Sequence, residues 1–155
     1  MTCILGLDFG TKRIGAALSD PGRSMSFPLE VYERRGPEQD ACHYRALVEA
    51  HDIDRIVIGL PVHTSGREGE LARLTRLFGA WMGDVTAKPV FFFDERYTTV
   101  EAEERLIAAG LKRQKRKAVR DKLAAQILLQ CYLDAGSPEV EPAPEPLFDP
   151  DETSA

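Results

Sequence analysis

The sequence contains few cysteines and no long apolar run, and each shortage excludes a class of protein. Three cysteines occur among 155 residues, and they form no CxxC pair. Such spacing is typical of free thiols in a reducing compartment and argues against a disulfide framework or a zinc site. No apolar stretch approaches the roughly 18 residues of a membrane span, and Asp8 interrupts the first apolar run too early for a signal peptide. These features predict a cytoplasmic protein with no membrane partner.

Positive charge is scarce overall, but its distribution matters more than its sum. The chain carries 20 Lys and Arg against 25 Asp and Glu, a formal net charge of −5, which by itself argues against a nucleic-acid partner. However, residues 137–155 hold six acids, five of the ten prolines and no base, which leaves 20 bases and 19 acids in residues 1–136. Within that body, residues 112–122 hold seven bases and one acid. We interpret residues 1–136 as one folded domain with a basic segment, and residues 137–155 as a disordered, acidic, proline-rich tail.

Hydrophobic periodicity predicts five strands and four helices in the order β-β-β-α-β-α-β-α-α. The strands are expected at 2–9, 14–19, 26–34, 53–60 and 88–93, and the helices at 37–51, 68–82, 98–110 and 119–135, with a basic loop at 111–117. Short turns between the first three strands favour antiparallel hairpins, whereas helices between the later strands favour parallel crossovers. The pattern therefore predicts an α/β domain with a mixed five-stranded sheet and flanking helices.

Acidic residues stand at the positions in such a sheet where ligands bind. Asp8 ends the first strand, and Asp94 and Glu95 end the fifth; ligands of open α/β sheets gather outside these carboxyl ends. Asp121 is the single acid of the basic segment and lies on the same helix face as the predicted buried stripe. Each acid also has a structural interpretation: Asp8 as a turn aspartate, Asp94 as the ion-pair partner of Arg96, and Asp121 as a favourable charge at a helix start.

Oxygen ligands and nearby cations together indicate a class of chemistry. Carboxylates suit Mg²⁺ or Mn²⁺, and two such ions can activate a water and stabilise the leaving oxygen in phosphodiester cleavage. Gly6 and Gly10 are expected to leave room for an ion or a large anion beside Asp8. Basic residues around the acids would neutralise phosphates, although a solvated helix start is the alternative interpretation of the basic segment. The candidate nucleic-acid contacts are Lys12, Arg13, Arg96, Lys112, Arg113, Lys115 and Arg116.

Four segments, in this order, resemble the YqgF family, also described as RuvX-type Holliday junction resolvases and pre-16S rRNA nucleases. They are ILGLDFGTKRIGAALSD at 4–20, IVIGLPVHTSGREG at 56–69, FFDERYTT at 92–99 and RDKLAAQILLQCYL at 120–133. The resemblance implies an RNase H-like fold and a metal-dependent nuclease. It places the family's catalytic, metal-binding acids on Asp8, Glu95 and Asp121, and Asp94 could share or replace the role of Glu95. More distant junction resolvases carry an acid at the end of the fourth strand, where this chain reads GLPVH at 59–63.

The favoured hypothesis is an Mg²⁺- or Mn²⁺-dependent nuclease that acts on structured nucleic acid as a monomer or homodimer. It would process the 5′ end of pre-16S rRNA in ribosome biogenesis, cleave branched DNA, or do both. One alternative is an assembly factor that binds rRNA without cutting it. A second is a nucleotide-binding module, because DFGT at 8–11 also resembles the first phosphate loop of actin-like ATPases. The tail adds a further hypothesis, in which its acids fold over the basic site and compete with the substrate.

Overall fold

The computed structural model describes residues 1–63, 65–96, 98, 104 and 113–139, with the backbone alone for 113–122. In chain order its elements are β1 Cys3–Asp8, β2 Arg13–Ser19, β3 Ser26–Glu33, α1 Pro37–Ala50, β4 Ile53–Leu60, α2 Glu70–Thr86, β5 Val90–Asp94 and α4 Arg113–Asp134. These elements follow the predicted order, and the predicted helix at 98–110 lies largely outside the described residues. Among the described helices, none combines the length and apolar character that a bilayer span requires.

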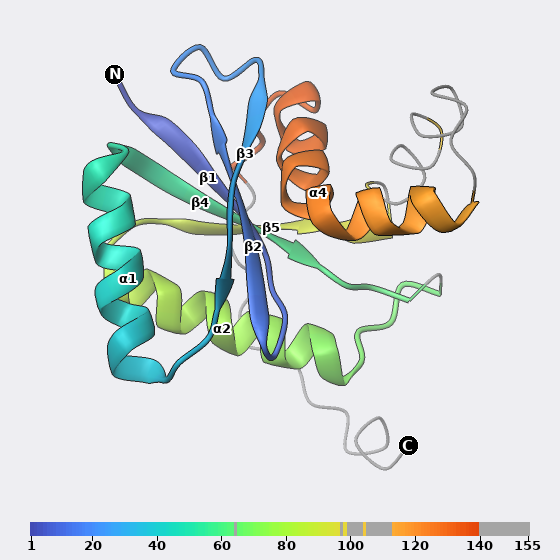
Figure 1. Cartoon of the computed structure of the whole chain (residues 1–155), viewed down its shortest axis with the longest axis horizontal. Coiled ribbons are helices and arrows are strands. Elements are labelled where there is room, and N and C mark those ends of the chain that lie inside the picture. Colours follow the sequence, from blue (N-terminus) through green and yellow to red (C-terminus); the bar gives the residue numbers. More distant parts are fainter. Residues whose placement is uncertain (64, 97, 99–103, 105–112, 140–155) are drawn as a thin grey trace.

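The strands form one mixed sheet in the order β3-β2-β1-β4-β5 (Figure 1). β2 pairs antiparallel with both β1 and β3, whereas β4 pairs parallel with both β1 and β5. The predicted mixed five-stranded sheet is thereby confirmed, and this strand order is that of an RNase H-like fold. Because β1, β4 and β5 are parallel, their carboxyl ends at Asp8, Leu60 and Asp94 lie at one edge of the sheet.

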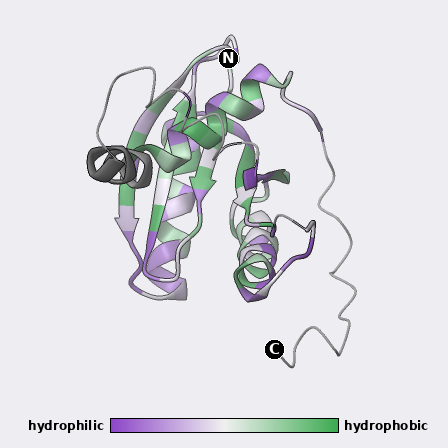
Figure 2. Ribbon diagram, turned by 90° about the vertical axis from the view of Figure 1, so that its right-hand side faces the viewer, coloured by the Kyte–Doolittle hydropathy of each residue, from purple (hydrophilic) through white to green (hydrophobic). Residues whose placement is uncertain are grey.

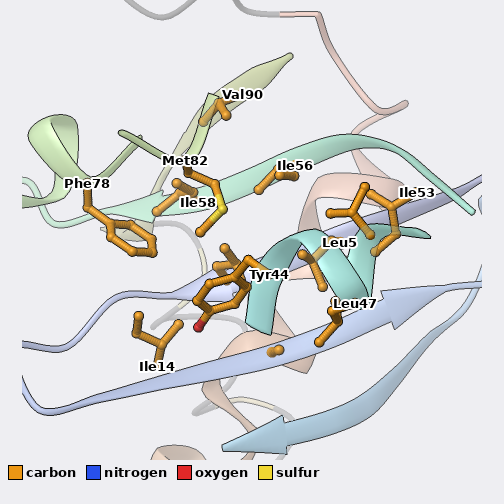
Figure 3. Packing of buried hydrophobic residues seen from close by; sticks show 13 residues of the cluster. Leu5, Ile14, Tyr44, Leu47, Ile53, Ile56, Ile58, Phe78, Met82 and Val90 are labelled. Atoms are coloured by element: carbon orange, nitrogen blue, oxygen red, sulfur yellow. The ribbon is translucent and has the colours of Figure 1, made fainter. Parts of the chain in front are cut away.

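Helices cover both faces of this sheet, α1 and α2 on one side and α4 on the other (Figure 1). Alternation along the strands supplies each face with apolar side chains, and Figure 2 shows hydrophobic residues concentrated along the strands. The cluster under α1 and α2, seen in Figure 3, includes Leu5, Ile14, Tyr44, Ile58 and Phe78. The cluster under α4 includes Ile4, Ala17, Val57, Leu129 and Tyr132.

The structure corrects the predicted start of the last helix. A basic loop was expected at 111–117, but α4 already includes Arg113. The run from 113 to 134 contains no glycine or proline, and Arg, Lys and Gln are good helix formers. Clustered positive charge therefore does not prevent helix formation here.

Two other helix boundaries also differ from the prediction. α2 continues to Thr86 and ends where Ala87 adopts a left-handed conformation with φ of 56°. Residues 95 and 96 are already helical, so the helix expected to begin at Thr98 starts earlier. The Thr98 hydroxyl donates a hydrogen bond to the Glu95 carbonyl oxygen at 2.7 Å. Its predicted capping partner, Glu101, lies outside the described residues, as does the predicted cap glycine Gly110.

Candidate functional site

Asp8 ends β1 on the face covered by α4. Gly6, two residues earlier on the same face, lies directly against this helix: a Cβ there would be 2.8 Å from the Leu129 Cβ. Gly15 of β2 is the cross-strand partner of Asp8, and a Cβ at Gly15 would lie 3.7 Å from the Asp8 Cβ and 3.6 Å from the Ala125 Cβ. Asp8 is therefore half-buried at the strand end, close to where Ala125 packs on the sheet.

The two glycines near Asp8 do not provide the room for an ion that the sequence suggested. The space above Gly6 is filled by Leu129. Gly10 lies so close to the carbonyl oxygen of Arg13 that an added Cβ would collide with it. Gly6 thus permits close approach of a helix, and Gly10 permits a tight turn between β1 and β2. Both uses are typical of glycine where backbone segments come close together.

Glu95 follows β5 and reaches across the end of β4 toward Asp8. A Cβ at Gly59 of β4 would lie 2.6 Å from Glu95 Oε1, so the Glu95 side chain covers this glycine. The Glu95 carboxyl group also hydrogen-bonds to Asp8. β4 lies between β1 and β5, and Gly59 is the residue that lets the two acids meet across it. Sequence reasoning noted that no acid ends β4, but it did not identify Gly59, whose signal was a glycine inside a strand.

The meeting of these two carboxyl groups favours the protonated form of Glu95. The pKa of Glu95 is raised to about 7, chiefly by burial and further by the negative charges of Asp8 and Asp94 and the hydrogen bond with Asp8. Two carboxylates that share a site repel each other unless a proton or a cation lies between them. A divalent ion removes this repulsion and is held by oxygen ligands of this kind. The donor set formed by Asp8 and Glu95 therefore fits a divalent cation.

Asp94, next to Glu95 in the sequence, is engaged by Arg96. Its carboxylate accepts hydrogen bonds from the Arg96 backbone N–H at 2.9 Å and from the guanidinium, with an ion-pair distance of 2.6 Å. Burial by itself would raise the pKa of Asp94, but the bonds from Arg96 outweigh it and hold that pKa below its usual value. This is the contact that the structural interpretation of Asp94 described. The roles of Asp94 as a metal ligand and of Arg96 as a nucleic-acid contact stay predictions.

Asp121 belongs to α4, and its backbone register points to the same edge of the sheet. Along this helix, Leu129 packs at Gly6 and Ala125 packs beside Gly15 and Asp8. Asp121 is one further turn toward the helix N-terminus, about 6 Å beyond Ala125. For Asp121 the structure describes the backbone alone. Among the described residues, no group of three or more His, Cys, Asp or Glu is placed to hold a metal ion. The convergence of Asp121 with Asp8 and Glu95 therefore stays a prediction.

The predicted nucleic-acid contacts divide between two regions. Lys12 is exposed in the turn that leads from β1 into β2, and Arg13 is exposed as the first residue of β2, close to Asp8. Arg113, Lys115 and Arg116 lie in the first turns of α4, where the backbone alone is described. Lys112 lies outside the described residues.

The amino-acid sequence matches the family model described as "RuvX: Holliday junction resolvase" over residues 2–135. Similar proteins from several bacteria carry the name "Putative pre-16S rRNA nuclease". The one from Dictyoglomus thermophilum is 40% identical over 134 residues, covering 86% of this chain and 96% of the relative. The one from Heliobacterium modesticaldum is 43% identical over 132 residues, covering 85% of this chain and 89% of the relative.

Solved structures of resolvases also resemble the chain. RuvC of T. thermophilus in complex with a Holliday junction substrate aligns with a TM-score of 0.49 and 16% identity, covering 88% of this chain and 98% of that one. The Fowlpox virus Holliday junction resolvase aligns with a TM-score of 0.48 and 11% identity, covering 86% of this chain and 99% of that one.

Proposed function

The chain belongs to the RuvX family of Holliday junction resolvases, and from this premise we propose that it is a metal-dependent nuclease of structured nucleic acid. The observation that carries the proposal is the contact between Asp8 and Glu95 across Gly59, at the carboxyl edge of the sheet. Such a pair of half-buried acids in contact is costly without a cation, and cleavage of a phosphodiester backbone is a reaction that uses one. The enzyme is accordingly a hydrolase of ester bonds.

Asp8 and Glu95 would hold the divalent ion, Mg²⁺ or Mn²⁺, and Asp121 would complete the site from α4. When bound, such an ion activates a water and stabilises the leaving oxygen. Glu95 would hold the ion in its deprotonated form, because metal ligands must be deprotonated. Asp8 holds a fixed position because β1 is paired on both sides. Lys12 and Arg13 contact the phosphates next to the cleaved bond.

For the substrate, we favour the 5′ region of pre-16S rRNA, as the names of the bacterial relatives suggest. Branched DNA is the second candidate, supported by the description of the family model. A junction-cutting enzyme needs two active sites and hence a homodimer, whereas cleavage of one RNA strand needs a single site. Processing of rRNA would take place in the cytoplasm. A binding factor that does not cut, or a nucleotide-binding module, is not favoured by the family assignment.

The test is cleavage of labelled pre-16S rRNA and of a labelled four-way DNA junction, each with and without Mg²⁺. We expect Asp8→Asn and Glu95→Gln to reduce cleavage by about 10²–10³-fold, the range for loss of one charge-stabilising group in an active site. Asp94→Asn, compared directly with Glu95→Gln, shows which neighbouring acid matters more, and we expect the smaller loss for Asp94→Asn.

Asp84→Asn provides the matched control for these variants. Asp84 is exposed on α2, so the same change of charge there should leave cleavage at the wild-type rate. Equal activity of Asp8→Asn and the wild type would refute the proposed mechanism. Cleavage of only one of the two nucleic acids would identify the substrate class.

A further inference from the structure

We propose that the substrate backbone leaves the active site across a surface formed by the β1–β2 turn and the β3–α1 connection, where Arg35 is an additional phosphate contact. This inference rests on the proposed function and specifies the path of the nucleic acid. The surface, called here the turn surface, consists of Lys12, Arg13, Arg34 and Arg35. Sequence reasoning assigned the first two residues to nucleic acid and overlooked the other two.

The turn surface is continuous with the active site. The turn begins immediately after Asp8, and the close approach of Gly10 to Arg13 makes it tight. The Arg34 N–H donates a hydrogen bond to the Lys12 carbonyl oxygen at 2.9 Å, which holds the β3–α1 connection beside the turn. Two basic pairs that are far apart in the sequence therefore lie side by side, next to the strand that ends in Asp8.

One of the four cations, Arg34, has a structural role. Its guanidinium lies over the rings of Phe9 and Phe78, at 5.4 and 5.8 Å from their centroids, and its Nε is 3.6 Å from Asp40. Cation–π contacts and an ion pair of this kind fix a side chain in place. Arg34 thus shapes the connection, and its substitution would disturb the local fold.

The other three cations remain available to a ligand. Lys12, Arg13 and Arg35 are exposed, and none of them forms an ion pair with another residue that the structure describes. The nearest buried acid, Asp40, accepts hydrogen bonds from the Tyr32 hydroxyl at 2.7 Å and from the Arg35 backbone N–H at 3.0 Å. Asp40 is therefore satisfied by neighbours other than the Arg35 side chain.

An unpaired group of exposed cations beside an active site that cuts phosphodiesters fits a phosphate backbone. On the opposite side of the site, Arg96 is held by Asp94, whereas the exposed cations Lys12, Arg13 and Arg35 lie on the side of β1 and β3. One exposed acid, Glu33, lies opposite Arg13 as its cross-strand partner and weakens the positive potential. Loss of the Arg35 charge should consequently weaken nucleic-acid binding, whereas loss of the Glu33 charge should strengthen it.

The test measures binding of the full chain, in the absence of divalent metal so that nothing is cut, to a labelled RNA hairpin with single-stranded flanks and to a four-way DNA junction. Affinity is recorded as a function of salt concentration for the wild type, Arg35→Ala and Glu33→Gln. Loss of one phosphate contact reduces the slope of log affinity against log salt by about 0.9. We expect this reduction for Arg35→Ala, with about tenfold weaker binding at low salt, and tighter binding for Glu33→Gln.

Arg45→Ala is the control, because Arg45 is an exposed arginine on α1 that lies near the end of α2, away from the turn surface. The Arg35→Ala variant keeps its backbone hydrogen bond to Asp40, so it should fold normally, which thermal unfolding checks. Equal effects of Arg35→Ala and Arg45→Ala, or no effect of either, would overturn the inference. Cleavage by the wild type in Mg²⁺, together with an unchanged Arg35→Ala slope, would refute the path alone. Binding of the wild type with no cleavage after Mg²⁺ is added would refute the nuclease proposal alone.

Discussion

At the scale of single residues, a glycine determines which acid reaches Asp8. Alternation along β1 was sufficient to place Asp8 on a defined face at the sheet edge, because the pairing of β1 with β2 is unbroken from Leu5 to Asp8. The same reasoning could not distinguish Asp94 from Glu95, since the chain changes from strand to helix between them. The choice depends on non-local contacts: Arg96 engages Asp94, and the missing side chain at Gly59 gives Glu95 its path.

We therefore predict that Gly59→Ala impairs the active site without unfolding the protein. The added methyl group would lie 2.6 Å from Glu95 Oε1 and 3.0 Å from its Cγ. Both atoms belong to a flexible side chain, so Glu95 would move away from Asp8 at little cost to the fold. We expect metal-dependent cleavage to fall by about 10–100-fold, as for other changes that misplace a metal ligand, and the pKa of Glu95 to decrease toward its usual value.

Cleavage rates at several Mg²⁺ concentrations, together with NMR titration of Glu95, measure the effect of Gly59→Ala. Gly83→Ala in α2 is the matched control, because its added Cβ would meet ordinary contacts, the nearest at 3.7 Å. That variant should cleave normally and be slightly more stable, since alanine favours a helix over glycine. Wild-type cleavage by Gly59→Ala would show that Glu95 does not need the space above β4.

At the scale of elements, the position of α4 on the sheet organises the site. A polar contact fixes its C-terminal half: the Ser26 N–H donates to Gln130 Oε1 at 2.9 Å, and Gln126 Nε2 donates to the Ser26 carbonyl oxygen at 3.1 Å. Gly6 determines how closely Leu129 approaches β1. The apolar stripe of this helix was predictable from its spacing. The close packing of the helix against Gly6 and its hydrogen bonds with Ser26 were not predictable, because these contacts join residues about 100 positions apart.

Because α4 packs so closely on β1 at Gly6, we predict that Gly6→Ala destabilises the protein. The new Cβ would lie 2.8 Å from the Leu129 Cβ, an atom fixed to the helix backbone, so the helix itself would have to move. Overpacking of this kind costs about 1–3 kcal/mol. Because Asp121 moves with α4, cleavage should decrease as well.

Urea unfolding with a cleavage assay on the same samples tests the effect of Gly6→Ala. Gly15→Ala on the neighbouring strand is the comparison, since its Cβ would make contacts of 3.6 and 3.7 Å, and we expect a smaller loss of stability. If Gly6→Ala were as stable as the wild type, α4 would not be held at the distance that the structure gives.

At the scale of the whole molecule, a buried arginine attaches the first residues after α4 to the sheet. Arg55, near the start of β4, donates to the Tyr132 hydroxyl at 3.2 Å and the Ser137 carbonyl oxygen at 3.3 Å, and it pairs with Glu139 at 3.0 Å. The Tyr132 hydroxyl in turn donates to the Pro138 carbonyl oxygen at 2.8 Å. Composition placed the domain boundary at 136, and the structure adds that residues 137–139 pack against the body. Composition could not indicate this, because one arginine on a strand has no periodic signal.

The hypothesis that the tail competes with nucleic acid can be tested by a truncation that spares the contacts of Arg55. Residues 140–155 hold five acids and lie outside the described residues. They follow residues 137–139, which Arg55 binds near the N-terminal end of β4. The active site is at the other end of this strand. Sixteen residues in extended form span about 50 Å, which is ample for the roughly 17 Å between Arg55 and the end of β4. Removal of residues 140–155 leaves the Arg55 contacts intact.

We expect this truncated chain to bind the RNA hairpin more tightly than the full chain at low salt, and the two affinities to converge as salt screens the tail. Truncation after Gly136 would also remove Ser137 and Glu139, so it should lower the melting temperature by leaving Arg55 without a carboxylate partner. Comparison of the two truncations separates competition from loss of stability. If the chain ending at Glu139 bound RNA as the full chain does at low salt, the tail would have no competitive role, and the net charge of −5 would not affect substrate binding.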